Sequence, residues 1–160
     1  MQIVLLLISV LVFSLGGRPQ QAFDKGGYYT SLASGRIMAI DSELTVLNAV
    51  QPKGKEAYEG ALLMRKAGLL HHAKEKLRVF RSGAVKLETA MAGDTGNGEY
   101  HFLRLIIQEH APAFLHYNKD MEKDSQQVYR TYGNLSPAVR KAIIDYCKNS
   151  KHLRAKELNG

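Results

Sequence analysis

Tryptophan is absent from this chain of 160 residues, and cysteine occurs only once, at position 147. A single cysteine excludes an intramolecular disulfide, so packing alone must hold the fold together. Proline occurs only four times, and alternating runs of β-branched residues are missing, which argues against a sheet-rich fold. Because Cys147 falls in an apolar stripe of helical spacing, we expect a buried, inert thiol; a reactive or intermolecular thiol is the alternative.

The familiar signatures of catalysis are missing as well. The sequence has no G-x-S-x-G, no phosphate-binding loop, no dinucleotide fingerprint and no Cys-His metal pattern, so we expect no cofactor and more readily a binding protein than an enzyme. One alternative stays open. His101, Glu109, His110 and His116 carry imidazole and carboxylate groups that could serve as a metal or acid–base site, although their spacing is not that of a metalloprotease.

Charge is absent from the N-terminal segment, where an apolar run extends from Ile3 to Leu15. Its thirteen residues are too few for a bilayer, which needs about 20, and suit the apolar region of a secretory signal peptide. We therefore predict a signal peptide over residues 1–16 and a protein exported to the periplasm or secreted. The alternatives are an uncleaved N-terminal membrane anchor and a buried element of a cytosolic domain.

The net charge of +7 is unevenly spread. The segment from Lys53 to Lys86 holds nine basic and three acidic residues. Such a segment could meet an anionic envelope surface, whereas export makes a nucleic-acid partner unexpected. A solvated helix face with spare positive charge is the plainer interpretation.

Apolar residues at spacings of three and four predict helices along most of the chain. We expect one single helical domain over residues 22–150 and a polar, basic, frayed tail over 151–160. Gly133 is expected to cap one helix at its C-terminus, and Ser136-Pro137 to begin the last. The predicted helices are one from Ile37 to just before Pro52, one over 55–70, a long one with Ala73, Leu77, Phe80, Ala84, Leu87 and Met91 on one face that continues through Gly83, and others over 99–111, 118–132 and from 137 through Cys147.

An internal repeat adds a fold-level expectation. Placing Gly35 over Gly68, an offset of 33, aligns apolar positions of two neighbouring segments. With Ala73 after Gly68 and Pro52 after the first unit, residues 23–117 resemble the tetratricopeptide repeat family. Together with the helices predicted along the rest of the chain, this gives an expected fold of about seven helices stacked as antiparallel hairpins, which the resemblance implies to be a right-handed array. The resemblance also implies a surface that binds a protein or peptide and performs no chemistry.

Together these features predict an exported, all-α binding or assembly module. Basic side chains would steer the partner, and tyrosines would contact it. An enzyme built on the Glu109/His110 region and a purely structural envelope protein are the alternatives. The residues expected at the binding surface are Lys74, Lys76, Arg78, Arg81, Tyr100 and Tyr117.

Overall fold

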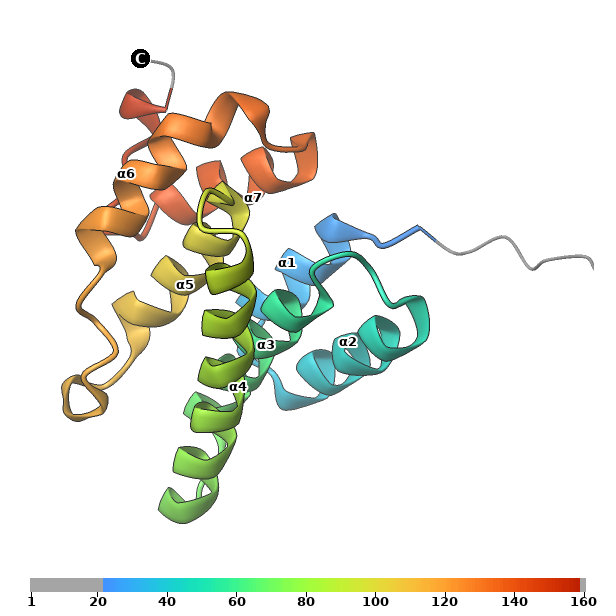
Figure 1. The fold of residues 1–160 in the computed structure, drawn as a ribbon. Coiled ribbons are helices and arrows are strands. Elements are labelled where there is room, and N and C mark those ends of the chain that lie inside the picture. The colour runs from blue at the N-terminus through green and yellow to red at the C-terminus, as the bar shows by residue number, and fades with distance from the viewer. Residues whose placement is uncertain (1–21, 159–160) are drawn as a thin grey trace, which may run out of the picture.

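The computed structural model describes residues 22–158, and within them the chain forms seven α-helices, three short 3₁₀ helices and no strand (Figure 1). The predicted all-α fold class is thereby confirmed. The α-helices are α1 (Lys25–Ala33), α2 (Ile37–Val50), α3 (Lys55–Leu69), α4 (Ala73–Gly93), α5 (Gly98–His110), α6 (Met121–Thr131) and α7 (Pro137–Cys147), and the 3₁₀ helices are η1 (Ala113–Leu115), η2 (Tyr132–Asn134) and η3 (Ala155–Glu157).

Helices α3 and α4 form a hairpin whose two backbones touch. A Cβ atom on Gly60 would stand 2.6 Å from the carbonyl oxygen of Gly83, and one on Gly83 would stand 2.5 Å from that of Gly60. Only glycine at both positions therefore allows the helices to approach this closely. Helix α4 runs unbroken through Gly83, as predicted, so the residue that weakens the helix locally is the one that lets the hairpin form.

Helix α3 is the centre of the fold. It packs against α1, α2, α4 and α5, and seven of its fifteen residues are buried. A helix that packs against neighbours on several sides is apolar over much of its circumference. Helix α3 is therefore less clearly amphipathic than α4. The buried residues of α3 are Ala57, Tyr58, Gly60, Ala61, Leu62, Met64 and Ala67.

The two glycines aligned by the internal repeat have different roles. Gly35 has a φ of +63° and makes the turn between α1 and α2, a conformation that L side chains rarely adopt. Gly68 instead lies within the last turn of α3, and the turn to α4 follows at residues 70–72. The likeness to tetratricopeptide repeats stays a prediction.

The second half of the chain follows the predicted order with shifted boundaries. Helix α6 begins at Met121, and α7 begins at Pro137 with Ser136 as its N-cap residue. The expectation that Gly133 caps α6 is wrong: its φ is not positive, because the chain continues into the right-handed 3₁₀ turn η2. Helix α7 then returns to pack against α1.

The expectation of a frayed C-terminal tail is also wrong for residues 151–158. Leu153 is completely buried and Leu158 nearly so, so the hydrophobic effect holds this basic segment on the domain. The predicted signal peptide, residues 1–16, lies outside the described residues. Within residues 22–158, no helix combines the length and the apolar character that crossing a membrane requires.

Candidate functional site

A groove of about 1260 Å³ opens between helices α1, α3, α4, α5 and α7. Its inner surface is predominantly apolar, with Leu32 of α1, Met64 of α3, Phe80 of α4 and Phe102 and Ile106 of α5 among its walls. The groove exceeds the roughly 300–1,000 Å³ typical of small-molecule sites. A groove of this size and lining has room for a large apolar ligand.

Small residues leave this space unfilled. Ala73, Ala138 and Ala142 all face the groove, the last two one turn apart on α7. Larger side chains at these positions would fill the space between α7 and α4, as side chains do in an ordinary core. At the mouth, the side chain of Phe114 in η1 is 74% exposed. The apolar lining thus extends from the interior to the surface.

Positive charge gathers at the end of the groove where α1 and α3 end and α4 begins. Arg36, Arg65 and Lys76 line it there. The Nε of Arg65 donates a hydrogen bond to the carbonyl oxygen of Leu32 at 3.3 Å. On the α7 side, Lys141 is paired with Asp145 at 2.6 Å.

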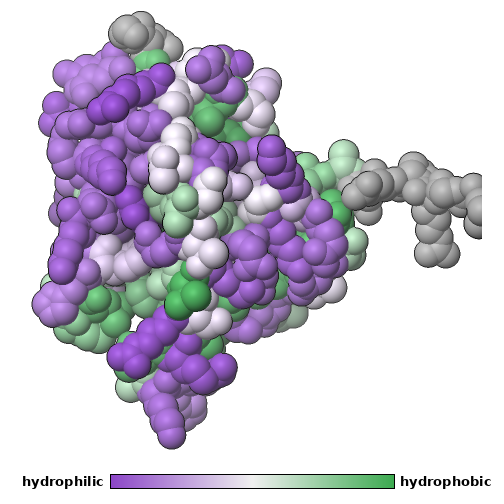
Figure 2. All heavy atoms as spheres, viewed as in Figure 1, coloured by the Kyte–Doolittle hydropathy of each residue, from purple (hydrophilic) through white to green (hydrophobic). Residues whose placement is uncertain are grey.

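The six predicted binding residues fall into three groups: one lysine that lines the groove, three exposed cations outside it, and two tyrosines. Lys76 lines the groove, whereas Lys74, Arg78 and Arg81 are exposed on α4 and do not line it. These exposed cations lie on the first half of α4, which projects at the lower end of Figure 1 and is strongly hydrophilic in Figure 2. Farther along α4, paler and apolar atoms follow the helix in Figure 2.

The two predicted tyrosines make contacts within the protein. Tyr100 is only 8% exposed, and burial raises the pKa of its hydroxyl. Tyr117 is half-buried, packs edge-on against Phe80 and donates a hydrogen bond to Glu88 Oε1 at 2.6 Å. Neither ring lines the groove, although Tyr117 packs against Phe80, which does.

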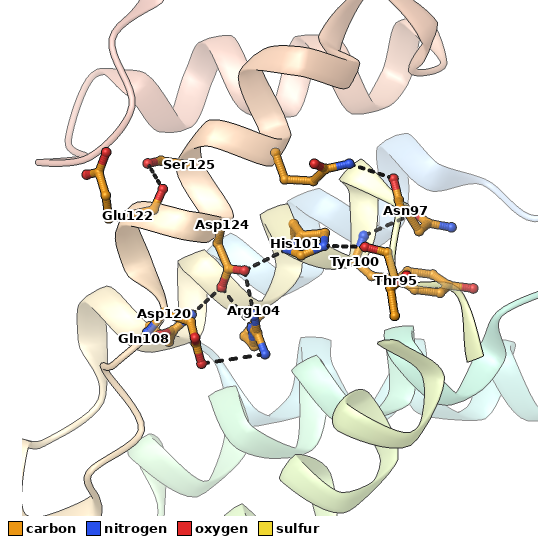
Figure 3. A network of polar contacts seen from close by, with 12 residues as sticks. Thr95, Asn97, Tyr100, His101, Arg104, Gln108, Asp120, Glu122, Asp124 and Ser125 are labelled. Carbon is orange, nitrogen blue, oxygen red and sulfur yellow. Dashed lines mark hydrogen bonds and ion pairs between the residues drawn. The ribbon is translucent and has the colours of Figure 1, made fainter. Parts of the chain in front are cut away.

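Apart from the groove, a cluster of polar side chains lies buried between α5 and α6 (Figure 3). The carboxylate of Asp124, which is completely buried, accepts hydrogen bonds from His101 Nδ1 at 2.6 Å and from Arg104 Nε and Nη2 at 2.8 and 2.6 Å. It also accepts one from Gln108 Nε2. His101 Nε2 contacts the carbonyl oxygen of Thr95 at 2.9 Å. Since both ring nitrogens of His101 face acceptors, both are engaged within the protein.

The electrostatics of this cluster favour the ion pair. Burial pushes the pKa of Asp124 upward, but the hydrogen bonds from His101 and Arg104 and the charge of Arg104 outweigh it, so the pKa lies below its usual value. Burial lowers the pKa of Arg104, and Asp124 and Glu88 more than restore it. Arg104 Nη1 reaches Glu88 at 3.0 Å. An Asp–His pair with both imidazole nitrogens occupied cannot act on a substrate without opening, so the cluster joins α5 to α6.

The residues of the predicted metal or acid–base alternative do not come together. His101 is buried in the Asp124 cluster, whereas His110 and His116 are exposed on α5 and after η1. Glu109 accepts hydrogen bonds from Ser150 Oγ at 3.0 Å and from two backbone N–H groups of the C-terminal segment. Among residues 22–158, no group of three His, Cys, Asp or Glu side chains is arranged to hold a metal ion.

Cys147 is half-buried at the end of α7, and burial raises the pKa of its thiol. A raised pKa disfavours the thiolate, which is the reactive form. The thiol is therefore half-buried where a buried one was expected, and its inertness stays a prediction.

Sequence reasoning missed the polar side of α5. His101, Arg104 and Gln108 are spaced by three and four residues, so they share one helix face, while the apolar positions Leu103, Ile106 and Ile107 form the more obvious pattern. This spacing was a usable signal. Asp124 carried no comparable signal, because nothing in α6 marks it as the buried acid among its several charged residues.

Comparison with known proteins identifies no relative for this arrangement. No protein-family model matches the chain, and no curated protein and no solved structure matches it.

Proposed function

We propose that this protein is an exported helical binding module that holds a large apolar ligand in the groove between α1, α3, α4, α5 and α7, without a catalytic step of its own. The observation that carries the proposal is the groove itself, about 1260 Å³ of predominantly apolar space open to the surface. Covering apolar surface is favourable, so the lining of the groove favours an apolar occupant. Export is supported by the apolar, uncharged run from Ile3 to Leu15.

The absence of tryptophan from the sequence provides a specific reporter. The Phe114→Trp variant places a single tryptophan at the mouth of the groove, where the native ring is exposed. Glycerol monolaurate, a neutral amphiphile with a twelve-carbon acyl chain, should shift the tryptophan emission to the blue in a saturable manner below the micellar concentration. Val85→Trp is the matched control, because Val85 is 67% exposed and does not line the groove; its emission should not change.

A blocking variant tests where the ligand lies. Ala142→Phe adds a ring to the α7 wall of the groove and should abolish the response of the Phe114→Trp reporter. A full response in the blocked variant would place binding elsewhere. No saturable response in the unblocked protein would contradict the proposed function.

Export is tested separately by intact-mass measurement on protein released from the producing cell. The expected mass corresponds to a chain that begins at Gly17. A released protein that retains Met1 would contradict cleavage at the predicted site.

A further inference from the structure

We infer that the ligand of this groove is a single-chain amphiphile with an anionic head group, such as a fatty carboxylate or a monoalkyl phosphate. The inference rests on the proposed function, because it names the chemical class that the same groove takes. It follows from how charge and apolar surface are distributed along the groove.

Within the part of the chain that the structure describes, the cations at the positively charged end of the groove have no carboxylate partner, although Arg65 Nε donates a hydrogen bond to the carbonyl oxygen of Leu32. Arg65 is half-buried, and its Nη2 lies 3.7 Å from where a Cβ of Gly35 would stand, so the guanidinium sits against the α1–α2 turn. Over residues 22–158, neither Arg65 nor Arg36 nor Lys76 has a carboxylate within ion-pair distance. Arg65 and Lys76 are half-buried and Arg36 is exposed, and taking a cation out of water without a partner is unfavourable. A carboxylate or phosphate supplied by a ligand would provide the missing partner, and a guanidinium binds either in a bidentate manner.

On the rest of the groove lining, the charged side chains have partners within the protein. Lys141 and Lys148 flank Asp145 at 2.6 and 2.8 Å, and His110 Nδ1 contacts the carbonyl oxygen of Ile106 at 2.8 Å. Among residues 22–158, the lysines and arginines of the lining that have no carboxylate partner thus lie at one end of the groove. A ligand with one charged head and one apolar tail matches this asymmetry better than a partner helix, whose charges would be distributed along its length.

The apolar walls would take the tail. Phe80, Phe102 and Ile106 contribute aromatic and branched surface to the groove. Burial of each additional methylene group is worth about 0.8 kcal/mol, which corresponds to about fourfold in affinity. Two methylene groups should therefore change the dissociation constant by about 15-fold.

The test uses the full chain with the Phe114→Trp reporter and four probes: laurate, dodecyl phosphate, decanoate and glycerol monolaurate, all below their micellar concentrations. We expect laurate to bind at least tenfold more tightly than the neutral monolaurate, since a hydrogen bond to a charged group typically contributes that much or more. Decanoate should bind about 15-fold more weakly than laurate. Whether laurate or dodecyl phosphate binds more tightly identifies the head group as carboxylate or phosphate.

Two variants test the cationic end. Arg65→Met and Lys76→Met keep an apolar stem and remove the charge, and each should weaken laurate binding by about tenfold while leaving glycerol monolaurate unchanged. Arg78→Met is the matched control, because Arg78 is exposed on the same helix as Lys76 and outside the groove. If Arg65→Met fails to fold by circular dichroism, Lys76→Met alone decides the outcome.

The outcomes separate this inference from the proposed function. Equal affinity for laurate and glycerol monolaurate, unaffected by either variant, would overturn the anionic head group and leave the apolar groove intact. Absence of binding by every amphiphile would overturn both. Saturable binding of an acidic amphipathic peptide in place of the amphiphiles would overturn the inference and assign the groove to a protein partner.

Discussion

Replacing Asp124 with Asn should strongly destabilise the protein. The carboxylate is fully buried and accepts hydrogen bonds from His101, Arg104 and Gln108. Asn is nearly isosteric, but it removes the negative charge and turns one acceptor oxygen into a donor that faces other donors. Arg104, whose side chain is only 10% exposed, would keep just the peripheral carboxylates Glu88 and Asp120, at 3.0 and 3.8 Å. Removing one partner of a buried pair typically costs about 3–5 kcal/mol.

Urea denaturation followed by circular dichroism measures this loss. The midpoint should fall while the slope stays unchanged, because the surface exposed on unfolding is the same. The control is Asp145→Asn, which removes an equal charge from a surface pair and should leave the midpoint unchanged within error. A loss below about 1 kcal/mol for Asp124→Asn would refute the view that this ion pair holds α6 on α5.

The same variant should alter the pH dependence of stability. The pKa of Asp124 is lowered in the folded state, so its contribution is present above the unfolded value of about 4 and is lost as the pH falls through the folded value. Between pH 5 and pH 2, the native protein should lose more stability than the Asn variant does. Parallel curves would show that Asp124 contributes nothing to this loss; Asp145, with a pKa lowered to about 2 by Lys141 and Lys148, contributes equally to both curves.

Three further experiments probe the rest of the fold. Gly60→Ala should destabilise the protein by about 1–3 kcal/mol because its Cβ would collide with α4. Gly68→Ala is the control: with open space around its Cβ, it should be neutral or stabilising by up to about 1 kcal/mol. Equal effects of the two variants in urea denaturation would contradict the backbone contact at Gly60. Glu109→Ala should speed tryptic cleavage of the C-terminal segment, measured by mass spectrometry, because Glu109 accepts its backbone N–H groups; an unchanged rate would show that the other contacts of the segment, the buried Leu153 and Leu158 and the hydrogen bonds of Tyr129, suffice to hold it. Cys147 should react slowly with an aromatic disulfide reagent at pH 8 and rapidly in urea, since burial raises its pKa; fast labelling of the native protein would identify an accessible thiol.

Helix periodicity predicted α2 to α7 because their apolar residues recur at the spacing of one helix face, but it did not predict α1 (Lys25–Ala33), which is scarcely amphipathic. Leu87 and Met91 recur at the spacing of one helix face, and both are buried. Gly83 is the instructive case. Its low helix propensity predicts only that it weakens α4. Its partner, Gly60, lies on another helix, and neither segment alone indicates that the two glycines meet.

The groove was beyond sequence reasoning for a similar reason. Of six predicted binding residues, only Lys76 lines it, because local charge density does not indicate which helix face a cavity occupies. The emptiness of the groove depends on small residues from different helices, Ala73 and Ala142 among them, meeting across one space. Alanine on a helix normally indicates only good propensity. Tyr100 and Tyr117 were expected at a surface because tyrosine favours interfaces, but their burial depends on tertiary neighbours.

Helix α5 contributes side chains to both the polar cluster around Asp124 and the apolar groove. Its face with His101, Arg104 and Gln108 binds Asp124 of α6, while Phe102 and Ile106 line the groove on another side. Because a helix moves as a rigid unit, loosening the Asp124 cluster would displace the groove wall as well. Asp124→Asn should therefore weaken amphiphile binding at urea concentrations where the helices remain formed, although Asp124 does not line the groove. Unchanged affinity in that variant would show that the α3–α4 hairpin and α7 alone set the shape of the groove, and that α6 is held in place independently of it.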